Sequence, residues 1–274
     1  IILNNNNNVA QGGVQQHLRQ PTSTRHTFAI DTTGFTDHIK NVHAINIDVV
    51  DRLETATTKS AKDWEESRRW LFDPSKYAHV DFKVGDRSIN RYARAPASTI
   101  HKFVDVGQMK EIDRDDVKGF IELFRLPEAG KSRFRLIKVP WEFNNDTEKS
   151  ILRKFHLPQK SDICRAVHAG DCCILIDFAS YFEEIPLGPE VAPFFCTRSG
   201  HKYYAQQRVL TGARQSCEIA DALTRKIIDA PGVSNTLALT YIDNVGLFNT
   251  KEQLIRDGTI ILDRCHQAGI TINE

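Results

Sequence analysis

Two aspartates, Asp177 and Asp243, each follow an almost uniformly apolar segment of strand length. Asp177 closes the run CCILID, and Asp243 comes after TLALTYI. An ionised carboxylate beside buried apolar strands is costly unless a positive charge compensates it. One aspartate at a strand end is usually a turn or helix-capping residue, whereas two in this setting favour a shared explanation. If the strands are neighbours, Mg²⁺ held by both carboxylates could support phosphoryl transfer, with one ion activating a hydroxyl and another neutralising the leaving group.

A basic stretch precedes the first aspartate. Between Lys131 and Lys160 there are eight lysines or arginines and three acidic residues, although the net charge of the whole chain is only +1. Such a stretch is either a solvated basic face or a surface that contacts phosphate groups. The overall charge favours neither interpretation.

Local patterns predict the elements that would position the two aspartates. The apolar run CCILIDF predicts a central strand buried on both faces. The segment TLALTYIDNVGLF predicts two strands around an Asp243–Asn244 turn. Apolar residues at helical spacing predict helices over 214–229 and from Leu254 to Gly269. HKYYAQQRVL reads as a further strand.

The chain before residue 161 is less regular. We expect residues 1–50 to be poorly structured and residues 51–116 to form a mixed, mainly helical subdomain with a helix over 58–72, ended by Asp73-Pro74. Within 117–160, GFIELFRL and SRFRLIKV predict a β-hairpin with a basic tip. A polar, helix-compatible stretch covers 146–155. The order of strands and helices predicts an α+β fold, with an antiparallel sheet and helices packed on one face.

Composition excludes several classes of protein. No apolar run approaches the ~18 residues of a membrane-spanning helix, so we expect no membrane partner. The six cysteines contain no CxxC pair, which favours a reducing intracellular compartment, either cytoplasm or nucleus. The ten histidines show no zinc-ligand spacing. Because the chain lacks an initiating methionine, we expect it to be a piece of a longer polyprotein. The asparagine run, Asn4 to Asn8, predicts a disordered tract.

Four motifs resemble those of one enzyme family. ILIDFASYFEEIPL resembles the first palm motif of reverse transcriptases, and RVLTGARQSCEIADALT their glycine-containing loop and helix. TYIDNVGLF resembles their Tyr-x-Asp-Asp hairpin, and KSRFRLIKVPWEFN their fingers hairpin. The motifs occur in the family's order over residues 117–274, and DRCHQAGITINE resembles the helix and strand that follow. The subgroup they resemble most is the retroelements that integrate with a tyrosine recombinase, the DIRS-like and VIPER-like group.

The resemblance implies an RNA-directed DNA polymerase built from fingers (117–160) and palm (161–274), without thumb or ribonuclease H segments. It implies Asp177 and Asp243 as catalytic metal ligands for Mg²⁺ or Mn²⁺. The partners would be an RNA template, a DNA primer and deoxynucleoside triphosphates.

Position by position, the resemblance also assigns substrate contacts. Phe182, five residues after Asp177, matches the aromatic that blocks a ribonucleotide 2′-hydroxyl; the alternative is a core aromatic beside Tyr181. Gly212 matches the glycine that lets the backbone approach the nucleotide. Arg135 matches the fingers arginine that holds the triphosphate, and Lys131 would assist it.

Two residues depart from the family pattern, and the departures keep other functions open. In the hairpin motif the resemblance implies that Tyr241 and Asn244 contact the substrate, but Asn244 replaces the motif's second aspartate. Thr211 stands where a glutamine is common. The loss of one carboxylate leaves open a decayed or repurposed copy that binds nucleic acid without catalysis. An RNA-templated RNA polymerase is a third candidate, against which Phe182 argues because such an enzyme must admit the 2′-hydroxyl.

Overall fold

The computed structural model describes residues 32–82, 95–233 and 236–273. The chain divides into Ile1–Asp31 and Thr32–Glu274, and every described element belongs to the second unit. The asparagine run lies outside the described residues, as does most of the segment 1–50 that was expected to be poorly structured.

Both predicted aspartate strands belong to one antiparallel sheet, of order β5-β9-β8. It consists of β5 (Cys172–Asp177), β8 (Leu237–Tyr241) and β9 (Asn244–Asn249). The loop between β8 and β9 is Ile242-Asp243, because Tyr241 pairs with Asn244. The predicted hairpin is therefore confirmed, with its turn one residue earlier than expected.

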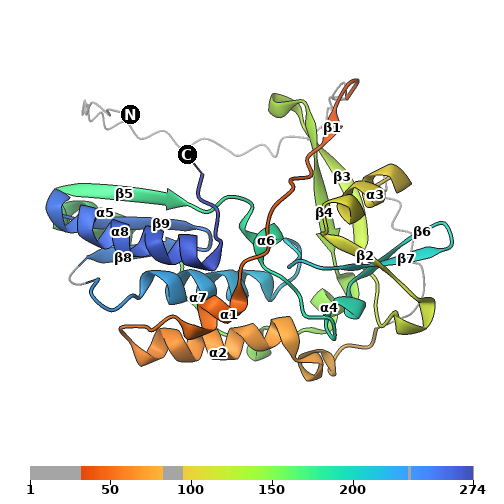
Figure 1. Cartoon of the computed structure of the whole chain (residues 1–274), viewed down its shortest axis with the longest axis horizontal. Helices are drawn as coiled ribbons and strands as arrows, with labels where there is room; N and C mark the ends of the chain where they lie inside the picture. Colours follow the sequence, from red (N-terminus) through yellow and green to blue (C-terminus); the bar gives the residue numbers. More distant parts are fainter. Residues whose placement is uncertain (1–31, 83–94, 234–235, 274) are drawn as a thin grey trace, which may run out of the picture. The chain divides into compact units, whose positions relative to one another are not determined.

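The edge strand β5 is covered on one side only. α8 (Lys251–Ala268) packs on β5 and β9, and α7 (Ser216–Ile228) contacts β8 (Figure 1). Ile176 is buried in the same apolar cluster as residues of both helices, whereas Leu175 is 77% exposed. The prediction that CCILIDF is buried on both faces is wrong. Side chains alternate along a strand, and a uniformly apolar run does not reveal that one face lacks a neighbour.

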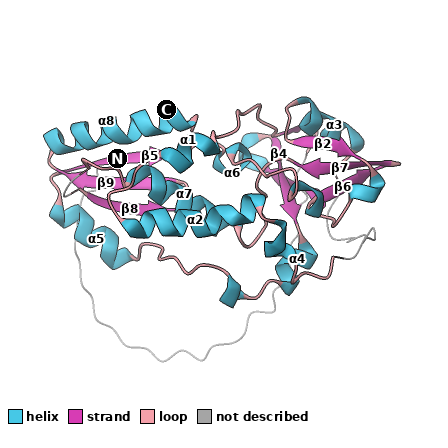
Figure 2. Cartoon of the chain, turned by 60° about the horizontal axis from the view of Figure 1, so that its bottom comes forward, coloured by secondary structure: helices cyan, strands magenta, loops and turns pink. Residues whose placement is uncertain are grey.

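Helix α7 lies at the centre of the main core. Four of its apolar residues at helical spacing, Ile219, Ala220, Leu223 and Ile227, are fully buried. α2 (Thr58–Phe72) packs along α7, and α1 (Ile47–Arg52) contacts it (Figure 2). The helix predicted over 58–72 is confirmed, but it packs on α7 rather than forming a separate subdomain.

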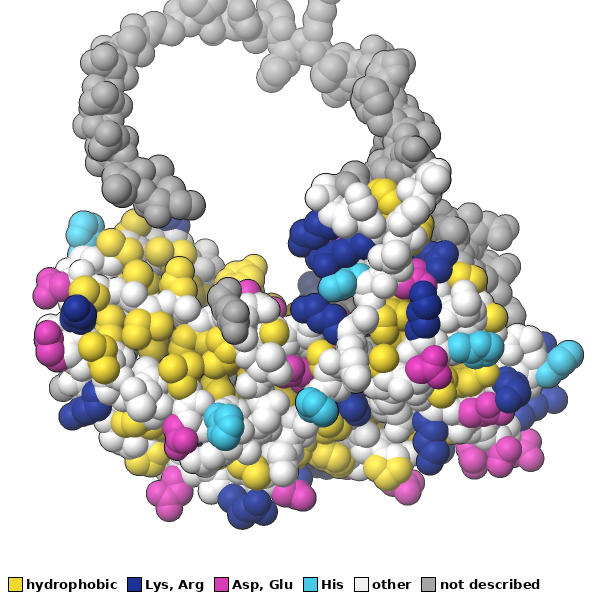
Figure 3. Space-filling model, turned by 45° about the horizontal axis from the view of Figure 1, so that its top comes forward, with side chains coloured by type: hydrophobic (Ala, Val, Ile, Leu, Met, Phe, Trp, Pro, Cys, Tyr) yellow, Lys and Arg dark blue, Asp and Glu magenta, His cyan; other side chains and the backbone are white. Residues whose placement is uncertain are grey.

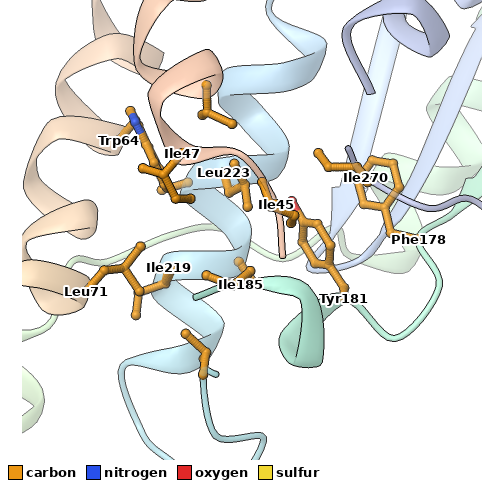
Figure 4. Close-up of a cluster of buried hydrophobic side chains, with 14 of the residues drawn as sticks. Ile45, Ile47, Trp64, Leu71, Phe178, Tyr181, Ile185, Ile219, Leu223 and Ile270 are labelled. Carbon is orange, nitrogen blue, oxygen red and sulfur yellow. The ribbon is translucent and has the colours of Figure 1, made fainter. Parts of the chain in front are cut away.

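The start of α1 and the segment just before it also contribute to this core. Ile45 and Ile47 lie among Trp64, Ile219 and Leu223 (Figure 4). The expectation of a poorly structured segment therefore fails for residues 45–50. Its apolar residues are too few and too closely spaced to show a period, and only tertiary packing reveals their role.

The predicted basic hairpin is present as part of a second sheet, of order β1-β4-β3. β3 (Glu122–Glu128) and β4 (Arg133–Val139) pair antiparallel, and a 3₁₀ turn, η3 (Ala129–Lys131), connects them. β1 (Thr36–Asp37) adds to β4 in parallel. Leu136 and Lys138 are buried on one face of β4.

The third sheet, of order β2-β7-β6, is antiparallel. It contains β2 (Met109–Ile112), β6 (Cys196–Ser199) and β7 (Lys202–Gln206). β7 confirms the strand predicted within HKYYAQQRVL. α3 (Ala97–Asp105) packs on β2, and its Ile100 and Phe103 share a small core with Leu136 of β4.

The helix-compatible stretch 146–155 is not a helix. α4 ends there (Trp141–Asp146), and only a 3₁₀ turn, η4 (Lys149–Ile151), follows before α5 (Lys160–Ala169). Arg153 explains the difference. Its backbone N–H donates to the Glu218 carboxylate, and its guanidinium donates to Asp221, so tertiary ion pairing overrides local helix preference.

The remaining short elements are α6 (Tyr181–Glu184), η1 (Pro74–Tyr77), η2 (Arg114–Asp116) and η5 (Ala192–Phe194).

The described residues thus form an α+β fold, with helices packed against small, mainly antiparallel sheets. None of the helices in this part of the chain combines the length and apolar character that crossing a bilayer requires.

Candidate functional site

The strand that ends at Asp177 lies beside the hairpin that carries Asp243, as predicted. Asp177 is the last residue of β5 and pairs with Asn244, the residue after Asp243. The backbone N–H of Phe178 donates to the carbonyl of Asp243 at 3.0 Å, which ties the two chain segments together just beyond the ladder. Neighbouring strands lie about 4.8 Å apart. Sixty-six positions separate these aspartates in the sequence, and the sheet brings them to one end of the β5-β9 pair.

Each carboxylate accepts a hydrogen bond from an asparagine amide. Nδ2 of Asn273 donates to Oδ2 of Asp177, and Nδ2 of Asn244 donates to Oδ1 of Asp243, both at 2.9 Å. No ion pair between described residues involves Asp177 or Asp243. A carboxylate has two oxygens with several lone pairs, so each retains capacity for a further ligand.

The backbone around the two aspartates is strained. Ile242, beside Asp243 in the hairpin turn, has φ +59°, and Ser180, three residues after Asp177, has φ +51°. A β-branched residue in the left-handed region is an outlier, and each such conformation costs of order 1–3 kcal/mol. Ser132, in the turn of the basic hairpin, is the other non-glycine residue with positive φ in the described ranges. Strain gathered in this way is typical of functional sites.

A cavity of about 500 Å³ opens beside Asp243. Four residues assigned by the resemblance or by the strand pattern line it: Arg135, Phe182, Gly212 and Asp243. Its volume is in the usual range for a small-molecule site. Lys131, Asp177, Tyr241 and Asn244 are not among the lining residues, and Lys131 and Tyr241 are both exposed.

One wall of the cavity is strongly basic. His38, Lys40, Arg133, Arg135 and Lys138 line it, against the acidic residues Glu183 and Asp243. Lys, Arg and His side chains gather beside the hollow in this face of the molecule (Figure 3). The wall carries an excess of positive charge, which suits a ligand with several negative charges.

The two hairpin arginines share a carboxylate. Nε of Arg133 donates to Glu128 at 2.6 Å, and Nη2 of Arg135 lies 2.9 Å from the same group. The hydrogen bond from Arg133 holds the pKa of Glu128 below its ordinary value. Because Arg135 is 59% exposed, its ion pair contributes little stability, about 0–1 kcal/mol. The Arg135 guanidinium can therefore exchange Glu128 for an anionic ligand at small cost.

The ammonium of Lys138 lies inside the protein. The side chain is buried, with Nζ 3.3 Å from Oε1 of Gln108 and 4.4 Å from the ring centre of Phe103. Burial lowers the pKa of Lys138 to about 8. The alternating pattern of β4 predicted an inward side chain here, but it did not predict a cation in a cavity.

Gly212 has a purely structural reason to be glycine. A Cβ at this position would lie 2.4 Å from the carbonyl oxygen of Lys138. The carbonyl of Gly212 accepts a hydrogen bond from Nδ2 of Asn144, so the loop is held against the β4 end of the hairpin. The close backbone approach implied by the resemblance is present here between two segments of this chain.

The two candidate aromatics after Asp177 have different surroundings. Tyr181 is 1% exposed, and its hydroxyl is hydrogen-bonded to Oγ1 of Thr224, which itself donates to the carbonyl of Ile242, so Tyr181 is the core aromatic. Phe182 is half-buried, packs partly on the core and lines the cavity. This placement fits a side chain that limits the space beside a bound ligand.

The donor set fits a hard divalent cation that is shared with a substrate. In the described ranges no cluster of three or more His, Cys, Asp or Glu side chains is arranged to hold a metal ion. Mg²⁺ in phosphoryl-transfer sites is usually bound by one or two carboxylates together with substrate phosphates. Asp177, at the end of β5, and Asp243, in the loop that leads into the neighbouring β9, could supply such carboxylates, and Asp243 lines the basic cavity.

Three features of the site escaped the sequence patterns: the cavity residues His38 and Lys40, and the amide of Asn273 on Asp177. His38 and Lys40 belong to a stretch that carries no periodic signal, and Asn273 reaches Asp177 only through pairing across 96 residues. No protein-family model matches the sequence and no curated protein matches it either, so the functional proposal depends on these residues and their arrangement.

Proposed function

We propose that this chain contains the fingers and palm of a reverse transcriptase, and that it transfers deoxynucleotides from their triphosphates to a primer 3′-hydroxyl on an RNA template. The observation that carries the proposal is the arrangement around one cavity. Asp243 lines it, Asp177 lies on the neighbouring strand, and Phe182 and Arg135 contribute from two other elements. A chance Tyr-x-Asp string would not bring these residues together.

In this proposal, the β5-β9-β8 sheet with α7 and α8 corresponds to the palm, and the β3–β4 hairpin corresponds to the fingers. Asp177 and Asp243 would hold Mg²⁺ or Mn²⁺. Bound metal would activate the primer 3′-hydroxyl and neutralise charge on the pyrophosphate that leaves.

The chain's own residues would bind and select the nucleotide. Arg135 would donate a charge-assisted hydrogen bond to the triphosphate after releasing Glu128. Phe182 would occupy the space that a ribose 2′-hydroxyl needs. The strained turns at Ile242 and Ser180 would fix the carboxylates before substrate arrives, which reduces the reorganisation needed for reaction.

A second function, nucleic-acid binding without catalysis, is favoured by one observation. The Asn244 amide donates a hydrogen bond to Oδ1 of Asp243, whereas the family pattern has a carboxylate at the position of Asn244. A copy that had lost polymerisation could retain the basic cavity wall and still bind phosphate groups.

The deciding experiment is primer extension on an RNA template, with deoxynucleotides and either Mg²⁺ or Mn²⁺. We expect incorporation by the wild-type chain and none by Asp177→Asn or Asp243→Asn. Tight primer–template binding without incorporation by any variant would favour the second function. Efficient incorporation of ribonucleotides instead would favour an RNA polymerase.

A further inference from the structure

The segment between β1 and α1 forms part of the cavity wall. His38, Ile39 and Lys40 line the cavity together with β4, although they lie about a hundred residues earlier in the sequence. None of them belongs to a motif on which the family resemblance rests. We call residues 36–40 the strap.

Buried polar contacts hold the strap at its first end. Asp37 pairs with Phe134 of β4, and its carboxylate is 1% exposed. Oδ2 of Asp37 accepts hydrogen bonds from Arg125 at 2.8 Å and from Thr99 at 2.6 Å. A buried carboxylate held by a guanidinium and a hydroxyl cannot move without breaking charge-assisted hydrogen bonds. This end of the strap is therefore fixed to β3 and α3.

The other end is fixed by backbone contacts. The N–H of His38 donates to the carbonyl of Phe134 at 2.9 Å, and Nε2 of Gln108 donates to the carbonyl of Lys40 at 2.9 Å. The same Gln108 accepts from the ammonium of Lys138, so one side chain connects the strap to the buried lysine. His38 and Lys40 are thus held in place without any ligand.

The hydrogen bond between Arg133 and His38 also determines which ring nitrogen of His38 can donate to a ligand. Nδ1 of His38 lies 3.1 Å from Nη1 of Arg133. A guanidinium only donates hydrogen bonds, so Nδ1 is the acceptor and the ring proton of the neutral imidazole is on Nε2. His38 therefore keeps one donor for another partner. Lys40 is exposed, and no side-chain hydrogen bond or ion pair within the described residues engages its ammonium.

We propose that the strap is a phosphate-binding element, in which Lys40 and His38 contact the polyphosphate of a bound nucleotide together with Arg133. The inference rests on the proposed function, because it assigns further residues to the same nucleotide site. Two observations support it: the strap lines the same cavity as Asp243 and Phe182, and its backbone is fixed in advance. A backbone that is ordered before binding reduces the conformational entropy lost when its side chains contact a ligand.

The shared chemistry is a phosphate group, which could also come from the backbone of a nucleic-acid strand. Three measurements on the full chain at fixed ionic strength distinguish the two sources. Calorimetry gives the Kd for inorganic tripolyphosphate, primer extension gives the KM for deoxynucleotides, and fluorescence anisotropy gives the Kd for a primer–template. The variants are Lys40→Ala, Lys40→Arg, Lys40→Glu and His38→Ala. Lys110→Ala is the control, because Lys110 is an exposed lysine of β2 outside the cavity.

We expect Lys40→Ala to weaken tripolyphosphate binding by roughly tenfold, since one charge-assisted contact is lost. Lys40→Glu should weaken it further, Lys40→Arg should restore it, and Lys110→Ala should have no effect. Equal tripolyphosphate affinity in the wild type and Lys40→Glu would overturn the inference. Weaker primer–template binding with unchanged tripolyphosphate binding would overturn it too, and would assign the strap to a nucleic-acid strand. Calorimetry does not require catalysis, so tripolyphosphate binding that depends on Lys40 but is accompanied by no primer extension would reject the polymerase and retain the phosphate site.

Discussion

Two pairs of acidic residues in this chain have opposite electrostatic surroundings. Glu218 and Asp221, on α7, are fully buried and surrounded by donors. Arg153 donates to both residues, and Arg225 donates to Asp221. The other pair, Asp177 and Asp243, has only asparagine amides as side-chain donors within the described ranges.

This difference separates acids that stabilise the fold from acids that are prepared for a ligand. The α7 pair receives its compensating charge from the chain, and the contacts join α2, α7 and the segment before α5. Among the described residues, no lysine or arginine forms an ion pair with Asp177 or Asp243. If a bound cation compensates the charges of Asp177 and Asp243, substitutions there should reduce activity and leave stability unchanged. Substitutions of Glu218 or Asp221 should instead reduce stability.

Asp243→Asn should have the largest effect on activity. Loss of a metal-binding carboxylate removes several kcal/mol of transition-state stabilisation, so primer extension should fall by about a thousandfold or more. Urea denaturation should show unchanged stability, because no ion pair is broken. Primer extension by Asp243→Asn at the wild-type rate would show that Asp243 is not part of the catalytic site.

Asp221→Asn should have the reverse effect. Removing one partner of a buried ion pair typically destabilises a protein by about 3–5 kcal/mol, and Arg153 would lose a carboxylate inside the core. The midpoint of urea denaturation should drop well below that of Asp243→Asn. A stable Asp221→Asn variant without activity would mean that the two pairs have been assigned the wrong way round.

Phe182→Val tests the cavity beside the strand pair. Opening space next to the sugar should reduce discrimination against ribonucleotides by more than tenfold, which corresponds to about 1.4 kcal/mol. The measurement is kcat/KM for matched deoxy- and ribonucleotides. Tyr181→Phe is the matched control, because Tyr181 is the core aromatic and its hydroxyl contacts Thr224. Equal discrimination in the wild type, Phe182→Val and Tyr181→Phe would show that Phe182 only packs on the core.

Glu184, two positions after Phe182, should make the stability of the protein depend on pH. Burial raises the pKa of its carboxyl, although Oε2 accepts from the backbone N–H of Thr271. A raised pKa means that the folded state holds the proton more tightly, so this stability is present below the ordinary carboxyl pKa and is lost as pH rises through the folded-state value.

Glu184→Gln should therefore be more stable than the wild type at neutral and alkaline pH, and the difference should shrink as pH falls toward ordinary carboxyl values. Urea midpoints measured across that range test the prediction. Glu190→Gln, at an exposed position, is the control. A difference that grows toward low pH would have the wrong sign and would show that Glu184 is ionised in the folded state.

Sequence patterns predicted the parts of the fold that local spacing determines. α2 has its predicted bounds because Trp64 and Leu71 repeat at helical spacing and Asp73-Pro74 ends the helix. The placement of the two aspartate strands in one sheet was also predictable, since each is an apolar run that needs a neighbour. The position of the strap was not predictable, because it depends on a contact between Asp37 and Arg125 across 88 residues. The amides on the two carboxylates were missed since hydrogen bonds of exposed side chains leave no sequence period.

Asn244→Asp should produce the smallest change and gives the finest test of the comparison between the two pairs. The substitution removes the amide on Asp243 and adds a like charge next to it, which disfavours the metal-free state. With Mg²⁺ bound, the added carboxylate is compensated, so activity should stay the same or rise a few-fold. Thermal melting should therefore show a larger stabilisation by Mg²⁺ in Asn244→Asp than in the wild type. Equal stabilisation in the two proteins would mean that no cation binds beside Asp243, and loss of a measurable wild-type activity would mean that the hairpin depends on the asparagine amide.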